Sequence, residues 1–415
     1  MVLLPGFCAG EQIDRARGDS YVKFYYPEFC AGRQASLALQ ICNMEGEEKT
    51  MKMIKGMDIS TLLEEEACGA KYYDFGEEAD LLDILKRYGV NSVRLRLWND
   101  PYDEQGNPYG AGTNDLDRTI CMAKRAKAAG MGFLLDYHYS DFWADPGKQI
   151  VPKAWQGYSP EQLEEAVYDY TVSTMTALRE AGVAPTMVQV GNELTNGLLW
   201  PTGQKPEFDQ LAKYINAGIR GVRAVDDQVK IMIHLDNGGF NEMYVEWFDH
   251  FMESGEDFDV IGLSYYPFWH GTLDQLEYNM RDLAKRYHKE LVVAEVSMGF
   301  TMEDYRDREG DPDKKLKGMA TKPELVENLE YPMTPKGQAD FMEDIMHRIK
   351  SVPGGLGFYY WEPAWIPVPG CGWATEAALR YTGEEGPGGN EWANQALFDY
   401  DGNSLPALRR IRDFR

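Results

Sequence analysis

The chain has 415 residues, of which 44% are hydrophobic and 13% aromatic, and its formal net charge is −25. This composition indicates a folded protein with a large core and excludes a disordered or fibrous chain. The negative charge argues against a nucleic-acid partner or an anionic membrane surface, because both bind basic patches, and no apolar stretch approaches the ~20 residues that a membrane span needs.

The first fifty residues differ from the rest of the chain. They show no sustained helical or strand period and hold three of the six cysteines, which lack CxxC spacing and therefore favour reduced thiols. Residues 1–50 are either a poorly structured N-terminal extension or a misannotated segment upstream of a true start at Met51 or Met53. The N-terminus lacks the basic region of a signal peptide, so the sequence as given predicts a cytoplasmic protein.

From residue 54 onward, short apolar runs alternate with longer amphipathic segments. The apolar runs predict eight strands, at 54–60, 92–98, 132–138, 187–193, 229–236, 260–267, 291–297 and 355–362. Apolar residues spaced i, i+3, i+4 predict helices between them, among them 75–89, 160–182, 208–225 and 334–352. Several helices are expected to end at a glycine, namely Gly89, Gly130 and Gly182.

Eight strand–helix units imply parallel strands with crossover helices. They predict an α/β protein whose residues 51–415 form a single (β/α)8 TIM barrel with enlarged βα loops. A doubly wound open sheet is the alternative, but no glycine-rich phosphate loop follows the first predicted strand.

Polar and aromatic residues stand at or near the C-terminal ends of the predicted strands. They are Asp58, Arg94, Arg96, Trp98, Asp136, His138, Asn192, Glu193, His234, Asp236, Tyr265, Tyr266, Glu295, Trp361 and Glu362. Any one of them could simply terminate a strand in solvent. In a TIM barrel, however, all these ends meet at the face that carries active sites, so their repetition at one end favours a functional site.

Two glutamates suggest the chemistry of that site. Glu193 ends the fourth predicted strand, and Glu295 lies among small apolar residues in the seventh. A buried carboxylate costs several kcal/mol unless it is paired or hydrogen-bonded. Strands four and seven lie on roughly opposite sides of an eight-stranded barrel, so the two carboxylates can face each other. Glycoside hydrolysis requires such a pair, with retention at roughly 5–5.5 Å separation and inversion at a wider one.

The neighbours of the glutamates predict their roles. Arg94 and Arg96 share one face of their strand, and whichever lies near Glu295 would lower the pKa of that carboxyl and keep it ionised as a nucleophile. Glu193 needs a raised pKa to act as a proton donor. Asn192 is placed to hydrogen-bond the 2-hydroxyl of a sugar.

Several stretches, taken together and in order, resemble glycoside hydrolase family 53, the arabinogalactan endo-β-1,4-galactanases. They are KGMDIS, VRLRLWNDP, LLDYHYSDFWADPGKQ, PKAW, VQVGNELTNGLLWP, IGLSYYPFWHG and YYWEPAWIP, which cover about residues 54–410. The resemblance implies a retaining endo-acting glycosidase in which Glu193 is the acid/base and Glu295 the nucleophile. It implies β-1,4-galactan or type I arabinogalactan as substrate, the side chains of pectin.

The resemblance also implies further site residues. Trp143 and Asp145 would lie near sugar subsites, and Trp361 would form the floor of the site. Further candidates for substrate binding are Asp58, Arg96, Asp136, His138, Asn192, Tyr265 and Tyr266. No cofactor is needed for the chemistry, but some bacterial members hold a structural calcium ion in the loop after the seventh strand. Here the candidate ligands are Asp304, Asp307 and Asp311, and a solvated run of charges is the alternative.

Other functions remain open at this stage. The glutamate pair fits a barrel glycosidase acting on another β-1,4-glycan, mannan or glucan, equally well, and a carbohydrate-binding barrel without turnover is a weaker alternative. A metal-dependent hydrolase would need clustered histidine ligands, whereas His138 and His234 fall on separate strands. The family is mostly secreted, so secretion is the alternative to the cytoplasm. We expect a monomer whose partner is a polysaccharide or oligosaccharide.

Overall fold

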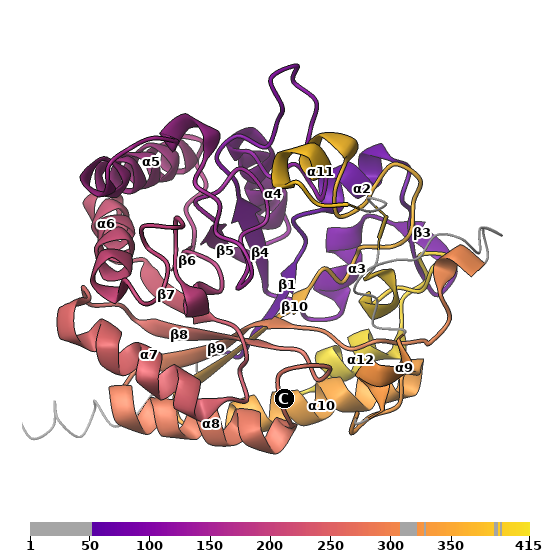
Figure 1. The fold of residues 1–415 in the computed structure, drawn as a ribbon. Helices are drawn as coiled ribbons and strands as arrows, with labels where there is room; N and C mark the ends of the chain where they lie inside the picture. The colour runs from indigo at the N-terminus through magenta and orange to yellow at the C-terminus, as the bar shows by residue number, and fades with distance from the viewer. Residues whose placement is uncertain (1–51, 308–321, 328, 386–388, 391) are drawn as a thin grey trace, which may run out of the picture. The chain divides into compact units, whose positions relative to one another are not determined.

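A computed structural model describes residues 52–307, 322–327, 329–385, 389–390 and 392–415. The predicted N-terminal extension lies outside this part of the chain. The predicted (β/α)8 barrel is confirmed, because eight parallel strands close on themselves in the order β1-β10-β9-β8-β7-β6-β5-β4 (Figure 1). Their bounds are β1 Ile54–Asp58, β4 Ser92–Leu97, β5 Gly132–Tyr137, β6 Met187–Val190, β7 Lys230–Leu235, β8 Val260–Tyr265, β9 Glu290–Val296 and β10 Gly355–Trp361.

Helices surround the strands, and neighbours such as α5 and α6 pack side by side (Figure 1). The helices that connect or flank the strands are α2 Leu62–Ala67, α3 Leu81–Arg87, α4 Leu116–Ala128, α5 Pro160–Glu180, α6 Phe208–Val225, α7 Asn241–Ser254, α8 Leu273–Tyr287, α9 Pro323–Val326, α10 Pro335–Ser351, α11 Glu376–Thr382 and α12 Pro406–Asp413. Within the described residues, no helix combines the length and the hydropathy of a membrane span.

The prediction of a helix over 75–89 is wrong in its first third. Residues 72–79 form a small antiparallel sheet of β2 Tyr72–Asp74 and β3 Glu77–Ala79. Phe75 and Gly76 turn the chain between these strands with φ of 53° and 83°. Helix α3 then begins only at Leu81, because the Asp80 side chain accepts a hydrogen bond from the Leu82 N–H and caps the first turn.

The expected glycine stops are confirmed at three helices. Gly89, Gly130 and Gly182 follow α3, α4 and α5 with φ of 79°, 76° and 76°. A residue without Cβ adopts this left-handed conformation freely, which lets the chain leave each helix and enter the next strand.

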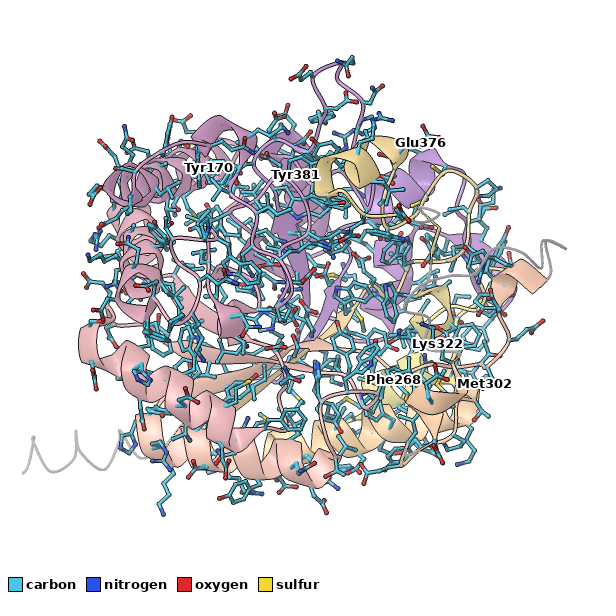
Figure 2. All side chains as sticks on the ribbon, viewed as in Figure 1. Tyr170, Phe268, Met302, Lys322, Glu376 and Tyr381 are labelled. Carbon is cyan, nitrogen blue, oxygen red and sulfur yellow. The ribbon has the colours of Figure 1, made fainter. Side chains whose placement is uncertain are left out.

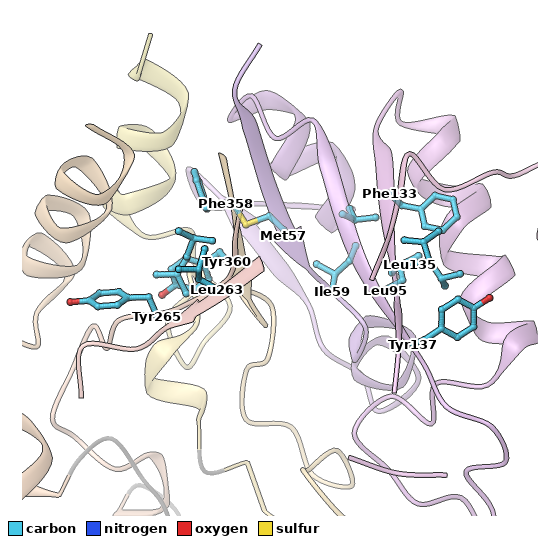
Figure 3. Packing of buried hydrophobic residues seen from close by; sticks show 14 of the residues in the cluster. Met57, Ile59, Leu95, Phe133, Leu135, Tyr137, Leu263, Tyr265, Phe358 and Tyr360 are labelled. Atoms are coloured by element: carbon cyan, nitrogen blue, oxygen red, sulfur yellow. The ribbon is translucent and has the colours of Figure 1, made fainter. Parts of the chain in front are cut away.

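Side chains alternate across the barrel wall and make two separate cores. On β8, Ile261, Leu263 and Tyr265 belong to the large outer core between the strands and the helices. Figure 3 labels Leu263 and Tyr265. Val260 faces inward and packs in the small apolar floor of the barrel, which is made of Ile54, Leu134, Met187, Met232, Val260, Val292, Ala294, Leu356 and Tyr359. The next inward positions toward the C-terminal ends of the strands are polar, and they build the site.

Candidate active site

A cavity of about 360 Å³ opens at the C-terminal ends of the strands. Six of the ten tryptophans of the chain line it, namely Trp143, Trp269, Trp361, Trp365, Trp373 and Trp392. Polar groups among these rings include Glu193 and Glu295. An aromatic wall with a few convergent polar groups is typical of a small-molecule or sugar site. We call it the barrel-mouth cavity.

The backbone after β6 turns Glu193 into this cavity. Gly191 has a φ of 84°, and a Cβ on it would lie 2.7 Å from Cδ2 of Leu194, so this position requires glycine. Glu193 itself is left-handed, with φ 48° and ψ 59°, and caps the short helix η2 Leu194–Asn196. A non-glycine residue in this region is strained, and such strain concentrates at functional positions.

A β-bulge brings Glu295 to the same cavity. Leu263 pairs with Val293, but the next residue Ser264 pairs with Glu295, so β9 carries one extra residue. Regular alternation would place Glu295 on the outer face with Leu291 and Val293. The bulge shifts the alternation by one and aims the carboxylate inward.

The two carboxylates are close together. One oxygen of Glu193 and one of Glu295 lie within 4.8 Å of each other. Inverting glycosidases hold their carboxyl groups at ≈ 6.5–9.5 Å to leave room for a water molecule, and retaining ones at ≈ 5–5.5 Å. The spacing fits the retaining arrangement.

Glu295 is held by a cation and a phenol. Its Oε1 lies 2.9 Å from Nη1 of the fully buried Arg94, and its Oε2 accepts a 2.6 Å hydrogen bond from the Tyr266 hydroxyl. Arg94 is in turn fixed by Asp58 at 2.8 Å and Asp136 at 2.9 Å. Of the two arginines considered from the sequence, Arg94 is therefore the one that supports Glu295.

Glu193 has a different environment. Its Oε1 accepts a 2.6 Å hydrogen bond from the Ser264 hydroxyl, and Ser264 Oγ lies 2.9 Å from Nε2 of the buried His234. Since the serine donates its proton to Glu193, its oxygen accepts from the Nε2–H of His234. The third neighbour is Asp236, whose pKa burial raises to about 6.

These environments separate the two glutamates. Burial raises the pKa of Glu193 well above its usual value, and the charges of Glu295 and Asp236 raise it further. Burial also raises the pKa of Glu295, while Arg94 and the Tyr266 hydrogen bond lower it. Arg94 thus lowers the pKa of Glu295, as expected from the sequence, but burial outweighs it and leaves the pKa above its usual value. The surroundings therefore favour an ionised Glu295 and a protonated Glu193.

The structure brings most of the predicted site residues to the cavity wall. Arg96, His138, Trp143, Asp145, Asn192, Tyr266 and Trp361 line it together with the glutamate pair. The Arg96 guanidinium lies 4.3 Å from the centroid of the Trp143 ring and pairs with Glu362 at 2.6 Å. The His138 Nε2 lies 3.0 Å from Asp136, and its Nδ1 accepts from the Ala144 N–H at 3.0 Å.

Three predicted substrate contacts lie elsewhere. Asp58 and Asp136 are fully buried beneath the cavity, where they hold Arg94. The prediction that Tyr265 contacts substrate is wrong. Its ring stacks on Phe341 of α10 at a centroid distance of 6.4 Å, and its hydroxyl donates to the Gly271 carbonyl at 3.0 Å. The reason is the alternation of side chains along the strand: Tyr265 shares the outer face of β8 with Ile261 and Leu263, whereas Ser264 faces inward.

Several lining residues were not anticipated. Trp365, Trp373 and Trp392 come from the segment after β10. Trp269 comes from the loop after β8, where its ring centroid lies 5.4 Å from that of Phe268, the residue labelled in Figure 2. The density of tryptophans after residue 360 was an available signal, but long loops have no period from which side-chain direction can be derived.

The proposed calcium ligands are only partly within the described residues. Asp304 accepts from the Nε and Nη2 of Arg306 at 3.2 and 2.6 Å, so an arginine already neutralises it. Asp311 lies outside the described part of the chain, as does the side chain of Asp307. Of the three candidates, Asp304 is the one whose side chain is described, and its carboxylate is already paired.

Within the described chain, Glu193, His234 and Glu295 offer ligand atoms within 4.8 Å of one another. Both His234 nitrogens already contact protein groups, with Gln189 Nε2 at 3.1 Å from Nδ1 and Ser264 at Nε2. The adjacent Arg94 cation further disfavours a second positive charge, so the trio is better explained as a hydrogen-bonded proton-transfer site than as a metal site.

Comparisons with known proteins agree with this geometry. The profile of Glycosyl hydrolase family 53 matches residues 54–411. An endo-beta-1,4-galactanase of Bacillus subtilis (strain 168) is 39% identical over 391 residues, which cover 89% of this chain and 87% of the relative. An arabinogalactan endo-beta-1,4-galactanase of Thermothelomyces thermophilus is 36% identical, over 75% of this chain and 90% of the relative. The solved Ignisphaera aggregans GH53 catalytic domain superposes with a TM-score of 0.79 at 42% identity, over 87% of this chain and 96% of that domain.

Proposed function

The chain belongs to glycosyl hydrolase family 53, and from that premise we propose that it is an endo-acting β-1,4-galactanase that hydrolyses galactan or type I arabinogalactan with retention. The observation that supports this most strongly is the pair Glu193 and Glu295, spaced within 4.8 Å and held in two unlike environments at the base of a tryptophan-lined cavity. The chemistry needs no cofactor.

In the first step, Glu295 attacks the anomeric carbon. Arg94 and Tyr266 orient its two oxygens, which leaves the carboxylate little freedom except toward the sugar above it. Glu193 protonates the departing glycosidic oxygen as that bond breaks, and the burial that raises its pKa supplies the proton. Because Oε1 of Glu193 accepts from Ser264, the transferred proton is carried by Oε2.

In the second step, the covalent galactosyl–Glu295 ester is hydrolysed. Once Glu193 has given up its proton, it acts as a base toward water, and the Ser264 hydrogen bond stabilises its ionised form. Water attacks the anomeric carbon from the face that the leaving group vacated, as the bond to Glu295 breaks, so the product has the configuration of the substrate. The ring-lined wall holds the sugars while this occurs, because large aromatic surfaces pack against the apolar face of a pyranose.

The test is hydrolysis of a panel of potato galactan, β-1,4-mannan, xylan and β-1,4-glucan, measured as the release of reducing sugar. We expect galactan to be cleaved in preference to the others, with mid-chain cuts that yield oligosaccharides first. NMR of the first product should show the β-anomer. A preference for mannan or glucan would contradict galactan as the substrate, and an initial α-anomer would exclude the retaining mechanism.

Three further properties are separate proposals. We propose a monomer, which light scattering would test at the 47.2 kDa chain mass. A structural calcium ion in the loop around Asp304 would make the melting temperature in calcium higher than that in EDTA. The ion pair between Arg306 and Asp304 argues against such an ion. Cytoplasmic and secreted locations are distinguished by fractionation and by mass spectrometry of the native N-terminus.

A further inference from the structure

A second cavity, of about 450 Å³, lies beside the barrel-mouth cavity. It is formed by the loop after β5, the turn that precedes α5 and the segment around Trp200. We call it the side cavity. Lys148 lines both cavities, so the loop after β5 has one on either side. The mechanism above uses nothing in the side cavity.

Three aromatic side chains line the side cavity, namely Trp155, Tyr158 and Trp200. Tyr158 is 43% exposed, one of the few large apolar side chains that the described part of the chain leaves that open. Trp155 is buried, and its ring centroid lies 5.9 Å from that of Tyr170 on α5. The backbone of Trp200 is tied to the loop after β5, since its N–H donates to the Gln149 carbonyl at 2.9 Å. Contacts with the loop after β5 and with α5 therefore hold the aromatic side chains of the cavity wall in place.

The side cavity offers hydrogen-bonding groups without net charge. Among the described residues Lys148 is its one charged lining residue, and the ammonium is paired with Glu384 at 2.9 Å and Asp145 at 3.3 Å. Gln149 is 2% exposed and donates to the Asn192 carbonyl at 2.8 Å, while its Oε1 has no partner among the described residues. Because the lysine is already paired and the described lining residues include no other charged side chain, the side cavity suits a neutral polyol better than a phosphate or a carboxylate.

We propose that the side cavity is an accessory carbohydrate site that binds a further stretch of β-1,4-galactan, outside the subsites where cleavage takes place. This inference rests on the proposed function for the identity of the glycan. Like the barrel-mouth cavity, the side cavity is lined by aromatic rings beside hydrogen-bonding groups, but with fewer rings and fewer charges. An endo-acting enzyme meets chains much longer than one cavity, so a second contact raises the local concentration of substrate without contributing to bond cleavage.

The experiment compares polymer with short substrate in the full chain. Tyr158→Ala removes an exposed ring, and Trp200→Phe shortens the second ring while keeping its backbone contacts. Tyr278→Ala, on α8 and 63% exposed, is the matched control for loss of a surface aromatic. Kinetics are measured on soluble potato galactan and on galactotriose, and melting temperatures verify folding. Retardation in native gels containing galactan is measured in a Glu295→Gln background.

We expect Tyr158→Ala to raise KM on galactan about three- to tenfold and to weaken retardation, with kcat on galactan and kcat/KM on galactotriose unchanged. Trp200→Phe should act in the same direction, and Tyr278→Ala should match the wild type. Unchanged polymer kinetics and retardation in both variants, with galactan still cleaved by the wild type, would overturn the accessory site alone. An equal loss on galactan and galactotriose would also overturn it, because the residues would then support the catalytic subsites. Wild-type enzyme that cleaves no galactan would instead refute the proposed function.

Discussion

The surroundings of the two glutamates differ although both side chains are buried at the same end of one barrel. Glu295 faces a guanidinium and a phenol, with Arg94 at 2.9 Å and Tyr266 at 2.6 Å. Glu193 faces the neutral Ser264 hydroxyl and lies near the carboxyl of Asp236. One neighbourhood stabilises a negative charge and the other disfavours it.

This difference shows how two chemically identical side chains come to perform opposite tasks. The cation and the phenol keep Glu295 available as a nucleophile, while burial and the neighbouring carboxylates keep a proton on Glu193. The division of roles is a property of the neighbours, so it can be broken by changing either the glutamates or the neighbours.

The largest effect is expected from the glutamates themselves. Glu295→Gln and Glu193→Gln should each lower kcat on galactan ~10³-fold or more, since one removes the nucleophile and the other the proton donor. An aryl β-galactoside with a very acidic leaving group separates them. It needs no proton donor in the first step, so Glu193→Gln should give a rapid burst followed by slow turnover.

Glu295→Gln should show no burst with that substrate, because no covalent intermediate can form. The melting temperatures of the two variants serve as controls for folding. A burst in Glu295→Gln and none in Glu193→Gln would reverse the assigned roles.

The next effect is on stability. Arg94→Met removes the cation from between Asp58, Asp136 and Glu295, which are all buried. Leaving such charges uncompensated costs about 3–5 kcal/mol. Chemical denaturation should therefore show a large loss, whereas Arg281→Met at a half-exposed ion pair with Glu277 should cost less than ~1 kcal/mol. Equal losses would mean that the buried network is not a stabilising unit.

A smaller effect is expected at the phenol. Tyr266→Phe removes one hydrogen bond to a charged group, worth about 1.5–3 kcal/mol, which corresponds to a loss of roughly 10- to 100-fold in kcat/KM. Tyr265→Phe is the matched control on the next residue, because that hydroxyl only donates to the Gly271 carbonyl behind the barrel wall. If Tyr265→Phe reduced kcat/KM as much as Tyr266→Phe, the placement of these two tyrosines would be wrong.

The smallest effect is a shift of the pH profile. The negative charge of Asp236 raises the pKa of Glu193, so Asp236→Asn should lower that pKa. Glu193 would then lose its proton at lower pH, and the basic limb of kcat/KM should move in the acid direction. Asp257→Asn, at an exposed site, should leave the profile unchanged. Movement of the basic limb toward higher pH would contradict this electrostatic effect of Asp236 on Glu193.

Much of the fold follows from local pattern. The eight apolar runs, the glycines after α3, α4 and α5, and the two arginines on one face of β4 all obey simple periodicities that sequence displays directly. The pairing of Glu193 with Glu295 could be predicted as well, because strand order in a barrel determines which ends face each other.

The errors come from places where the period is interrupted or absent. Counting two by two along β8 would have placed Tyr265 on the outer face and Ser264 on the inner one. The same count along β9 gives the wrong face for Glu295, because the bulge inserts one residue. Trp373 and Trp392 reach the cavity from irregular loops, whose course depends on packing rather than on local preference.

The central claim is that Glu295 forms the covalent bond to the sugar while Glu193 moves the proton. The most direct test is to trap the intermediate with an activated 2-deoxy-2-fluoro-β-galactoside or the corresponding galactobioside and to locate the label by peptide mass spectrometry. We expect one sugar per chain, attached to Glu295 in the peptide VVAEVS, with loss of labelling in Glu295→Gln. A label on Glu193 would contradict this assignment of roles.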